Sequence, residues 1–345
     1  CRQATGAAES GEAMTDSEHS ERDAAPRYAY LGPSGTFTEA ALRQVADPAT
    51  STFLPQTDVV SALEAVRTGD ADFAVVAIES TAEGGVTATL DSLAVGRPLV
   101  LLREMLVSVG FTVAGPPGTR LEDVGRIAAH PHAWVQCRRW LAANLAGVVH
   151  VPATSNTAPA ALMTDRQRRL GAGEVGVPAL PFDAALVPPG AVESYGLQAL
   201  ATDVEDNPNA MTRFVLVGLP GDLPERTGAD KTTLVVHLPD NESGALLNML
   251  EQFATHGVSL SRIESRPIGD ALGRYSFSVD AEGHVWDERV GAALMGLHRV
   301  CPVVRFLGSY PRVDEVRTAV RRGTVDGDFV AAREWLEALR RGAGD

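Results

Sequence analysis

Hydroxyl, amide and carboxylate side chains follow short apolar runs at several points of the chain. In residues 31–39 (LGPSGTFTE), the hydroxyls of Ser34, Thr36 and Thr38 surround a glycine turn that precedes an apolar helical pattern. Hydroxyls and backbone N–H groups at the start of a helix favour binding of a carboxylate or phosphate. A plain capped strand-turn-helix has the same pattern, so this segment alone does not establish a site.

A second polar group ends the apolar run 73–78, which is typical of a buried strand. Glu79, Ser80 and Thr81 follow this run, and a glycine pair precedes the next helical pattern. In open α/β sheets ligands bind at the carboxyl ends of strands, so these three side chains are candidates for substrate contacts. The alternative for Glu79 is a cap or an ion pair at the surface.

Residues 130–137 (HPHAWVQC) form a third candidate. His130 and His132 have no third metal ligand nearby, so we expect a structural strand-to-helix turn and no metal site. Gln136 lies one helical turn further on, on a face that could look into a cleft. Cys137 is interpreted as a core residue rather than a nucleophile.

Two more segments complete the set. Ser155 and Thr157 lie in a run of small polar residues before a helical pattern, where they provide either a simple cap or an anion site. Thr212 and Arg213 begin an apolar strand pattern and could supply one hydroxyl donor and one carboxylate clamp. Together the five segments predict a cleft for a small polyanion. The sequence contains no P-loop, Rossmann fingerprint, zinc signature or nucleophile elbow.

The elements that must position these side chains alternate between strand and helix patterns over residues 28–218. This alternation predicts an α/β region with helices on both faces of a mostly parallel sheet, divided into two lobes with a cleft between them. Strands are predicted at 28–31, 73–78, 99–102, 111–113, 184–187 and 214–218, and helices from 36 and at 59–66, 86–93, 133–145 and 158–163.

A second unit follows a Pro- and Gly-rich linker at 219–231. Residues 232–311 contain strand and helix patterns in the order βαββαβ, which is the ferredoxin-like arrangement and is more often regulatory than catalytic. Residues 312–345 form a tail with an amphipathic helical pattern at 329–339. Residues 1–27 are polar, lack the apolar core of a signal peptide and are predicted to be disordered.

Composition limits the classes of function. The 345 residues carry a formal charge of −14, which argues against a nucleic-acid or anionic-membrane surface. No apolar run approaches the ~18 residues that span a bilayer. The three cysteines have no metal-ligand or disulfide pattern, which indicates a reducing, cytoplasmic location.

Two longer segments resemble signatures of a known family. Residues 195–217, with Tyr195, Asp206 and the run from Thr212, resemble the signature of prephenate dehydratases, and residues 260–267 (LSRIESRP) resemble the effector loop of their ACT domains. The other polar segments follow in the family's order, and the resemblance covers about residues 28–311. It implies two catalytic lobes hinged like a periplasmic binding protein, followed by an ACT domain.

The resemblance also implies a reaction and its residues. Prephenate would lose CO2 and its ring hydroxyl to give phenylpyruvate, and aromatisation drives this reaction without a cofactor or metal. Thr212 would donate a hydrogen bond to the departing hydroxyl, with Glu79 and Gln136 as further catalytic residues. Arg213 could instead be structural. The substrate-binding residues would be Ser34, Thr36, Ser80, Thr81, Ser155, Thr157 and Arg213.

One departure from the family pattern leaves the product open. Ser80 stands where the family usually has an asparagine, so a donor amide is lost. Some relatives decarboxylate prephenate and keep its hydroxyl, and this alternative remains beside the dehydratase. A third alternative is a silent protein that only senses prephenate or an amino acid.

Regulation by phenylalanine is implied by the same resemblance. The effector would contact Gly244, Ala245, Leu246, Glu264, Ser265, Arg266 and Pro267 at the interface between paired ACT domains, in a homodimer or homotetramer. Ser243 and Ser259 depart from the family pattern at this site. The alternative is that the ACT domain serves only for dimerisation.

Overall fold

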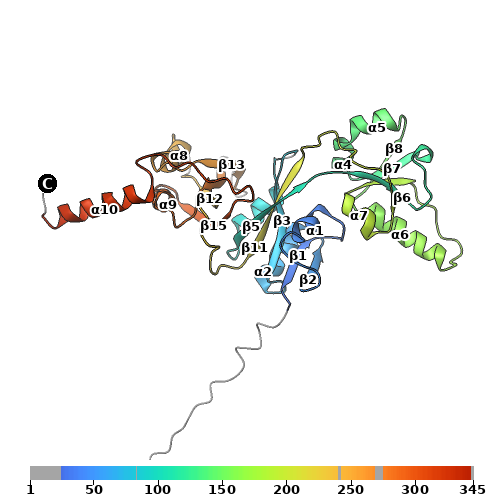
Figure 1. The fold of residues 1–345 in the computed structure, drawn as a ribbon, viewed down its shortest axis with the longest axis horizontal. Coiled ribbons are helices and arrows are strands. Elements are labelled where there is room, and N and C mark those ends of the chain that lie inside the picture. Colours follow the sequence, from blue (N-terminus) through green and yellow to red (C-terminus); the bar gives the residue numbers. More distant parts are fainter. Residues whose placement is uncertain (1–24, 83, 240–241, 269–274, 343–345) are drawn as a thin grey trace, which may run out of the picture.

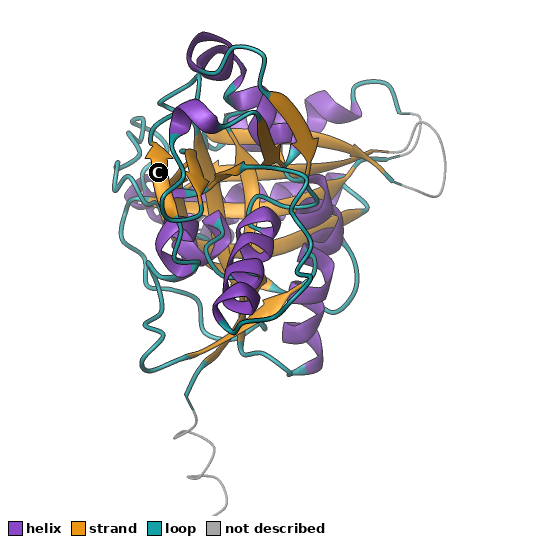
Figure 2. Cartoon of the chain, turned by 90° about the vertical axis from the view of Figure 1, so that its right-hand side faces the viewer, coloured by secondary structure: helices purple, strands orange, loops and turns teal. Residues whose placement is uncertain are grey.

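The chain forms three β-sheets that follow one another along the long axis of the molecule (Figure 1). The computed structural model describes residues 25–82, 84–239, 242–268 and 275–342. Helices pack on the outside of the sheets (Figure 2). We call the first sheet with its helices lobe 1, the second lobe 2 and the third the C-terminal domain. Of the segment 1–27, predicted to be disordered, residues 1–24 lie outside the described residues, whereas Arg27 already belongs to the first strand.

Lobe 1 has a mixed sheet in the order β2-β1-β3-β11-β5. β1, β2 and β3 are parallel, whereas β11 is antiparallel to β3 and β5, so the prediction of a mostly parallel sheet is wrong. The reason is that β5 leads out to lobe 2 and β11 returns beside it. The elements are β1 (Arg27–Leu31), α1 (Phe37–Leu42), β2 (Thr52–Gln56), α2 (Val59–Thr68), β3 (Phe73–Ser80), β4 (Gly84–Gly85), α3 (Thr87–Ala94), β5 (Val100–Ser108) and β11 (Met211–Gly218).

Lobe 2 has a five-stranded mixed sheet in the order β10-β6-β9-β7-β8. The single helix predicted at 133–145 is wrong, because the chain leaves helical geometry at Cys137. The Asp206 carboxylate accepts hydrogen bonds from the N–H groups of Arg139 and Trp140 and so starts a second helix. The elements are β6 (Thr112–Gly115), β7 (Arg126–Ala129), α4 (Pro131–Gln136), α5 (Arg138–Asn144), β8 (Val149–Pro152), α6 (Ala158–Gly171), β9 (Ala184–Val187), α7 (Pro189–Ser194) and β10 (Gln198–Ala201), with a 3₁₀ turn at Leu121–Asp123.

Two crossing segments, 109–111 and 202–210, join the lobes side by side. Val109 N–H donates to Ala210 O at 2.8 Å, and Val204 N–H donates to Phe111 O at 3.1 Å. The connection is therefore a pair of chain segments linked by backbone hydrogen bonds rather than two separate loops.

The C-terminal domain has the βαββαβ order that its sequence predicts. Its antiparallel sheet runs β13-β14-β12-β15, and both helices pack against one core with the sheet. β12 begins inside the segment predicted as linker. The elements are β12 (Asp230–His237), α8 (Ala245–Thr255), β13 (Leu260–Pro267), β14 (Tyr275–Glu282), α9 (Glu288–Val300) and β15 (Val303–Pro311).

Lobe 1 and the C-terminal domain share one hydrophobic core. Val235, Leu307 and Tyr310 of the C-terminal domain belong to the same buried cluster as the apolar faces of α2 and α3. Gly308 lies so close to the Leu101 backbone that a Cβ would overlap its carbonyl oxygen. The two units therefore pack as one body.

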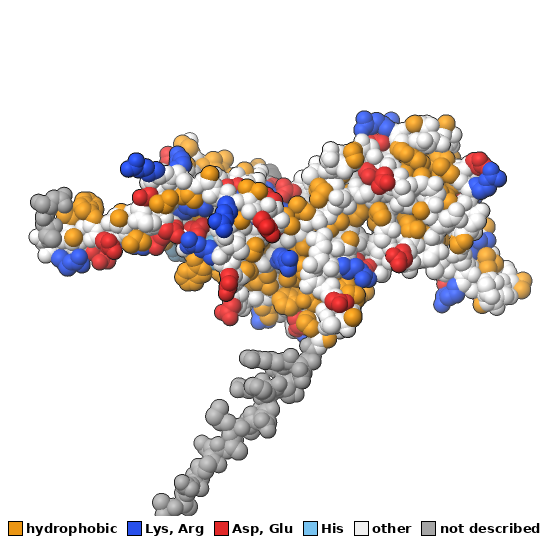
Figure 3. Space-filling model, in the orientation of Figure 1, with side chains coloured by type: hydrophobic (Ala, Val, Ile, Leu, Met, Phe, Trp, Pro, Cys, Tyr) orange, Lys and Arg blue, Asp and Glu red, His pale blue; other side chains and the backbone are white. Residues whose placement is uncertain are grey.

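The tail ends in α10 (Asp326–Arg340), which includes the predicted helical segment 329–339. None of its residues is buried, and it extends away from the C-terminal domain (Figure 1). Charged side chains of both signs are interspersed with apolar ones over α10 and the neighbouring domain (Figure 3). In the described part of the chain, no helix is long and apolar enough to cross a membrane.

Candidate active site

The sheet of lobe 1 brings several predicted residues to one edge. β1 and β3 are parallel, so their carboxyl ends lie at the same edge, and the antiparallel β11 begins there. Ser34 and Thr36 follow β1, Ser80 and Thr81 lie at the end of β3, and Thr212 lies at the start of β11. These five residues come from three distant parts of the sequence.

Thr212 and Ser80 lie directly opposite each other on adjacent strands. Residues opposite in an antiparallel pair point to the same face of the sheet, so their hydroxyls are neighbours. The Thr81 N–H donates to Met211 O at 2.9 Å, and the Met211 N–H donates to Thr81 Oγ1 at 3.0 Å. Within the described residues the half-buried Thr212 hydroxyl has no hydrogen-bond partner, so it is available to a ligand.

The turn before α1 already holds a carboxylate of the protein. Ser34 Oγ and the Gly35 N–H donate to Glu39 Oε2 at 2.6 and 2.5 Å, and Thr36 Oγ1 donates to Leu31 O at 3.1 Å. Burial would raise the pKa of Glu39, but hydrogen bonds from Ser34 and Gly35, with Arg43 behind them, lower it. The ionised Glu39 therefore accepts the hydrogen bonds of the Ser34 hydroxyl and the Gly35 N–H, which the sequence pattern assigns to a bound anion. The substrate contacts of Ser34 and Thr36 stay a prediction.

The sheet of lobe 2 presents a second group at its own edge. β7, β8 and β9 are parallel, so Gln136 after β7 and the polar turn after β8 lie at the same end of the sheet. Ser155 Oγ accepts a hydrogen bond from the Ala158 N–H at 3.0 Å, which leaves its own hydroxyl hydrogen to donate.

Two buried polar atoms at this turn have no hydrogen-bond partner. They are the Thr157 hydroxyl, on a side chain that is 0% exposed, and Asn156 Oδ1. An unpaired buried polar group costs about 1–3 kcal/mol, which a ligand hydrogen bond can recover. Thr157 precedes the 14-residue helix α6, whose amino-terminal dipole favours an anion. The turn before α6 is therefore a candidate anion-binding site.

The two edges touch each other. Tyr195 Oη donates to Ser34 O at 3.1 Å across the lobes, and a Cβ on Gly35 would lie 2.8 Å from Ala191 Cα in α7. The Thr157 hydroxyl lies beside Tyr195 without the alignment of a full hydrogen bond. Residues from both groups therefore flank one junction.

Two residues at this junction were not among the predicted site residues. Tyr195 bridges the lobes, and the Asp206 N–H donates to Gln136 O at 2.7 Å shortly before β11 begins. Both lie in the segment 195–217, whose resemblance to a family signature was the available signal.

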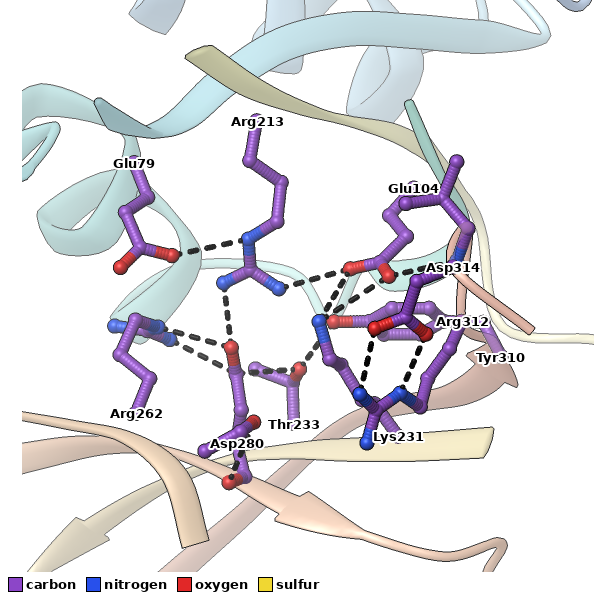
Figure 4. Close-up of polar contacts among 12 residues, drawn as sticks. Glu79, Glu104, Arg213, Lys231, Thr233, Arg262, Asp280, Tyr310, Arg312 and Asp314 are labelled. Carbon is purple, nitrogen blue, oxygen red and sulfur yellow. Dashed lines mark hydrogen bonds and ion pairs between the residues drawn. The ribbon is translucent and has the colours of Figure 1, made fainter. Parts of the chain in front are cut away.

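Arg213 and Glu79 are the next pair along the two strands, so their side chains lie on the opposite face from Thr212 and Ser80. Figure 4 shows the Arg213 guanidinium pointing toward Glu79. Arg213 Nε lies 3.2 Å from Glu79 Oε2, in an ion pair that is not aligned as a hydrogen bond. Its Nη1 lies 3.1 Å from Glu104 Oε2 and its Nη2 2.5 Å from Asp280 Oδ2. All three guanidinium nitrogens thus face carboxylates of the protein, which favours the structural alternative for Arg213.

The charges in this cluster stabilise one another. Burial opposes the charge of Arg213, but Asp280, followed by Tyr310 and Glu104, outweighs this effect and raises its pKa. Burial likewise opposes the charge of Asp280, but Arg213 and Arg262 lower its pKa. Both groups are therefore ionised in the folded protein.

The predicted effector residues lie in two elements of the C-terminal domain. Gly244 and Ala245 start α8, and Leu246 is exposed; Gly244 has a φ of +86°. Glu264, Ser265, Arg266 and Pro267 lie on β13, an edge strand of the sheet.

Two of these effector residues also contact lobe 1. The Glu264 carboxylate lies against Gly85, and the Arg266 guanidinium bonds Asp91 at 3.1–3.2 Å. Part of β13 is therefore a contact surface within the chain.

Residues 28–221 match the family model described as prephenate dehydratase. The chain belongs to the prephenate dehydratase family. The prephenate dehydratase of Mycolicibacterium vanbaalenii is 45% identical over 330 residues, which cover 92% of this chain and 99% of the relative.

Solved structures of this family and of one other activity are similar. The prephenate dehydratase of Arthrobacter aurescens in complex with L-Phe is 49% identical, with a TM-score of 0.82 and coverage of 91% of this chain and 99% of that one. GqqA, described as a novel type of quorum quenching acylase, is 29% identical, with a TM-score of 0.70 and coverage of 83% and 97%. Similarity in fold thus extends to another activity, so the reaction requires a direct test.

Proposed function

We propose that this chain is a prephenate dehydratase that converts prephenate to phenylpyruvate, CO2 and water. The observation that carries the proposal is the unpartnered Thr212 hydroxyl beside Ser80, at the edge where the lobes meet. Membership of the family supports the same reaction.

The reaction needs two functions from the site. As the bond to the ring carboxylate breaks, its electron pair enters the ring, and the bond to the hydroxyl at the opposite carbon breaks. Thr212 donates a hydrogen bond to the departing oxygen, which leaves as water after gaining a proton. The hydroxyls of Ser155 and Thr157 and the amino terminus of α6 hold a carboxylate of the substrate. Gln136 and Glu79 remain predicted catalytic residues.

The domain assignment is part of the proposal. Lobes 1 and 2, residues 28–218, form the catalytic region, with a hinge of the periplasmic-binding-protein type at the paired crossing segments. Residues 219–231 form the linker, residues 232–311 the ACT domain and residues 312–345 a helical tail. The hydrogen-bonded crossings and the βαββαβ order support this division.

Incubation with prephenate separates the alternatives. Phenylpyruvate, detected by its ultraviolet absorption in base, is the expected product. Release of CO2 with a non-aromatic product that keeps the hydroxyl would instead identify a decarboxylase, in which Ser80 fails to replace the usual asparagine. Prephenate that binds unchanged would identify a sensor.

We also propose that phenylalanine binds the ACT domain, at residues 244–246 and 264–267, in a homodimer or homotetramer. The L-Phe complex of the Arthrobacter aurescens relative supports phenylalanine as the effector. The test is a titration with phenylalanine, in which activity and the molar mass from light scattering after gel filtration are measured. Phenylalanine should lower turnover or change the oligomeric state. No change in either at millimolar phenylalanine would leave dimerisation as the domain's function.

A further inference from the structure

A network of charges, most of them buried, joins the catalytic strands to the C-terminal domain (Figure 4). Its anions include Glu79 on β3, Glu104 on β5 and Asp280 on β14, and its cations are Arg213 on β11, Lys231 on β12 and Arg262 on β13. The side chains of Glu104, Asp280, Arg213 and Arg262 are at most 7% exposed, whereas that of Glu79 is 41% exposed. Removing one of the buried members leaves its partner buried and unpaired.

Asp280 is the most constrained member of this network. Its side chain is 0% exposed. Arg262 Nε and Nη2 both bond it at 3.0 Å, and Thr233 Oγ1 donates to its Oδ1 at 2.8 Å. Tyr310 Oη in turn lies 2.7 Å from Thr233 Oγ1. The carboxylate therefore has a single position and orientation.

The network continues from Asp280 to the predicted active site through one residue. Arg213 bonds Asp280 with one end of its guanidinium and pairs with Glu79 at the other. Arg213 and Glu79 face each other on β11 and β3, and the next pair along these strands is Thr212 and Ser80. A shift of Arg213 would displace the strand ends that carry the Thr212 and Ser80 hydroxyls.

We propose that Asp280, in the C-terminal domain, is a positioning residue of the active site. It acts through Arg213 to hold Glu79 and the β3–β11 strand ends in their reactive arrangement. The expected effect of Asp280 on turnover rests on the proposed function, whereas its expected effect on the geometry of the strand ends does not. The C-terminal domain is thus part of the catalytic architecture even without an effector.

The matched control is another ion pair between the same two bodies. Asp91 on α3 pairs with Arg266 on β13 but does not contact Arg213. Asp91→Asn therefore weakens the attachment of the domain without touching the network. If attachment alone mattered, both substitutions would change kcat and exchange in the same direction, with a smaller change in Asp91→Asn because the Asp91 side chain is 54% exposed.

Steady-state kinetics with prephenate form the first arm. Asp280→Asn keeps the shape of the side chain and removes its charge, and we expect kcat to fall about tenfold or more, since small misplacements of reacting groups cost up to ~10²-fold. KM should change less, and Asp91→Asn should keep wild-type kcat. Thr233→Val removes one hydrogen bond to Asp280 but keeps the charge of Asp280, so we expect a smaller decrease in kcat. This variant replaces Asp280→Asn in the test if Asp280→Asn folds poorly.

Amide hydrogen exchange forms the second arm and needs no substrate. The amides of Thr81 and Val86, bonded to Met211 O and Ile78 O, report on the ends of β3 and β11. We expect about tenfold faster exchange at these amides in Asp280→Asn and Thr233→Val, and wild-type exchange in Asp91→Asn. Equal exchange and equal kcat in Asp280→Asn and Asp91→Asn would overturn the proposal. A wild-type protein that makes no phenylpyruvate would instead overturn the proposed function, with the exchange arm still deciding on Asp280.

Discussion

The Thr212 hydroxyl is a weak acid, so its effect on a reaction depends on where it is held. Thr212 lies opposite Ser80 on the neighbouring strand. Its hydroxyl has no hydrogen-bond partner within the described residues and is therefore free to donate. We predict that Thr212→Val lowers kcat by about 10²-fold or more, the scale of a lost acid or oxyanion donor. The measurement is phenylpyruvate formation at saturating prephenate.

Thr212→Ser is the control for this substitution, since it keeps the donor and removes only a methyl group. It should retain most of the activity. Near-wild-type turnover in Thr212→Val would show that another group assists the departure of the hydroxyl.

The buried cysteines should be unreactive. Cys137 is 0% exposed, and burial, followed by the charges of Glu205 and Asp206, raises the pKa of its thiol; burial also raises the pKa of Cys301. Because the thiolate is the reactive form, we predict that neither thiol in a Cys1→Ser variant reacts with a disulfide reagent at pH 8. Both should react after unfolding in guanidinium, and rapid labelling of the folded protein would contradict the burial of Cys137.

At the scale of elements, the contact between β15 and β5 depends on Gly308. This residue has a φ of +130°, and a Cβ would overlap the Leu101 carbonyl oxygen. Gly308→Ala should therefore destabilise the protein, measured by thermal or guanidinium unfolding. Gly323→Ala is the matched control, because Gly323 also has a positive φ but has open space around it.

Both substitutions place an alanine at a positive φ, but only Gly308→Ala also brings a Cβ into contact with the Leu101 backbone. We expect Gly308→Ala to lower the free energy of unfolding by at least ~2 kcal/mol more than Gly323→Ala does, which is within the range measured for overpacked cores. Equal losses would mean that β15 can move away from β5 at little cost.

Elements with a clear apolar pattern could be predicted from the sequence, and short strands interrupted by polar residues or proline could not. The βαββαβ order and the four apolar residues of β9 followed from such patterns, but β2, β7, β8 and β10 were missed because each has only four or five residues and contains at least one polar residue. The break between α4 and α5 was also missed. It depends on Asp206, which is distant in sequence and supplies the cap of α5.

At the scale of the whole molecule, the buried network makes stability depend on pH. The folded pKa of Asp280 lies below its unfolded value of about 3.9. Its contribution is therefore complete above that value and is lost as the pH falls through the folded pKa. The free energy of unfolding of Asp280→Asn should be lower than wild type by about 3 kcal/mol, the cost of breaking a buried pair.

Guanidinium unfolding of both proteins from pH 8 to pH 3 measures this difference. It should be constant from pH 8 to 5 and should shrink below about pH 4, because the unfolded chain then binds a proton at Asp280 while the folded protein keeps the carboxylate ionised. A difference that shrinks between pH 8 and pH 6 would show that another group controls it.

The candidate site was partly predictable for the same physical reasons. Ser34 and Ser80 could be grouped from their sequence patterns, because the parallel strands β1 and β3 end at the same edge of the sheet. Thr212 joins them only because β11 is antiparallel and begins at that edge. The contact between Arg213 and Asp280 could not be predicted, because it depends on how two domains dock and leaves no local pattern. From the sequence, Arg213 could bind a carboxylate of the substrate. Only the structure shows that its guanidinium instead faces three carboxylates of the protein.

The paired crossings between the lobes have a consequence for how the chain can be rebuilt. Ser108 at the end of β5 and Met211 at the start of β11 are direct partners in one antiparallel ladder, so all of lobe 2 is an insertion at the tip of a β-hairpin. A short two-residue turn could close that hairpin and replace residues 109–210. The remaining chain would keep the shared core, the charge network and the C-terminal domain. Gene segments encoding lobe 2 could then be exchanged between relatives as a single insertion, provided that the contacts of Tyr195 and Ala191 with the turn at 34–35 are kept.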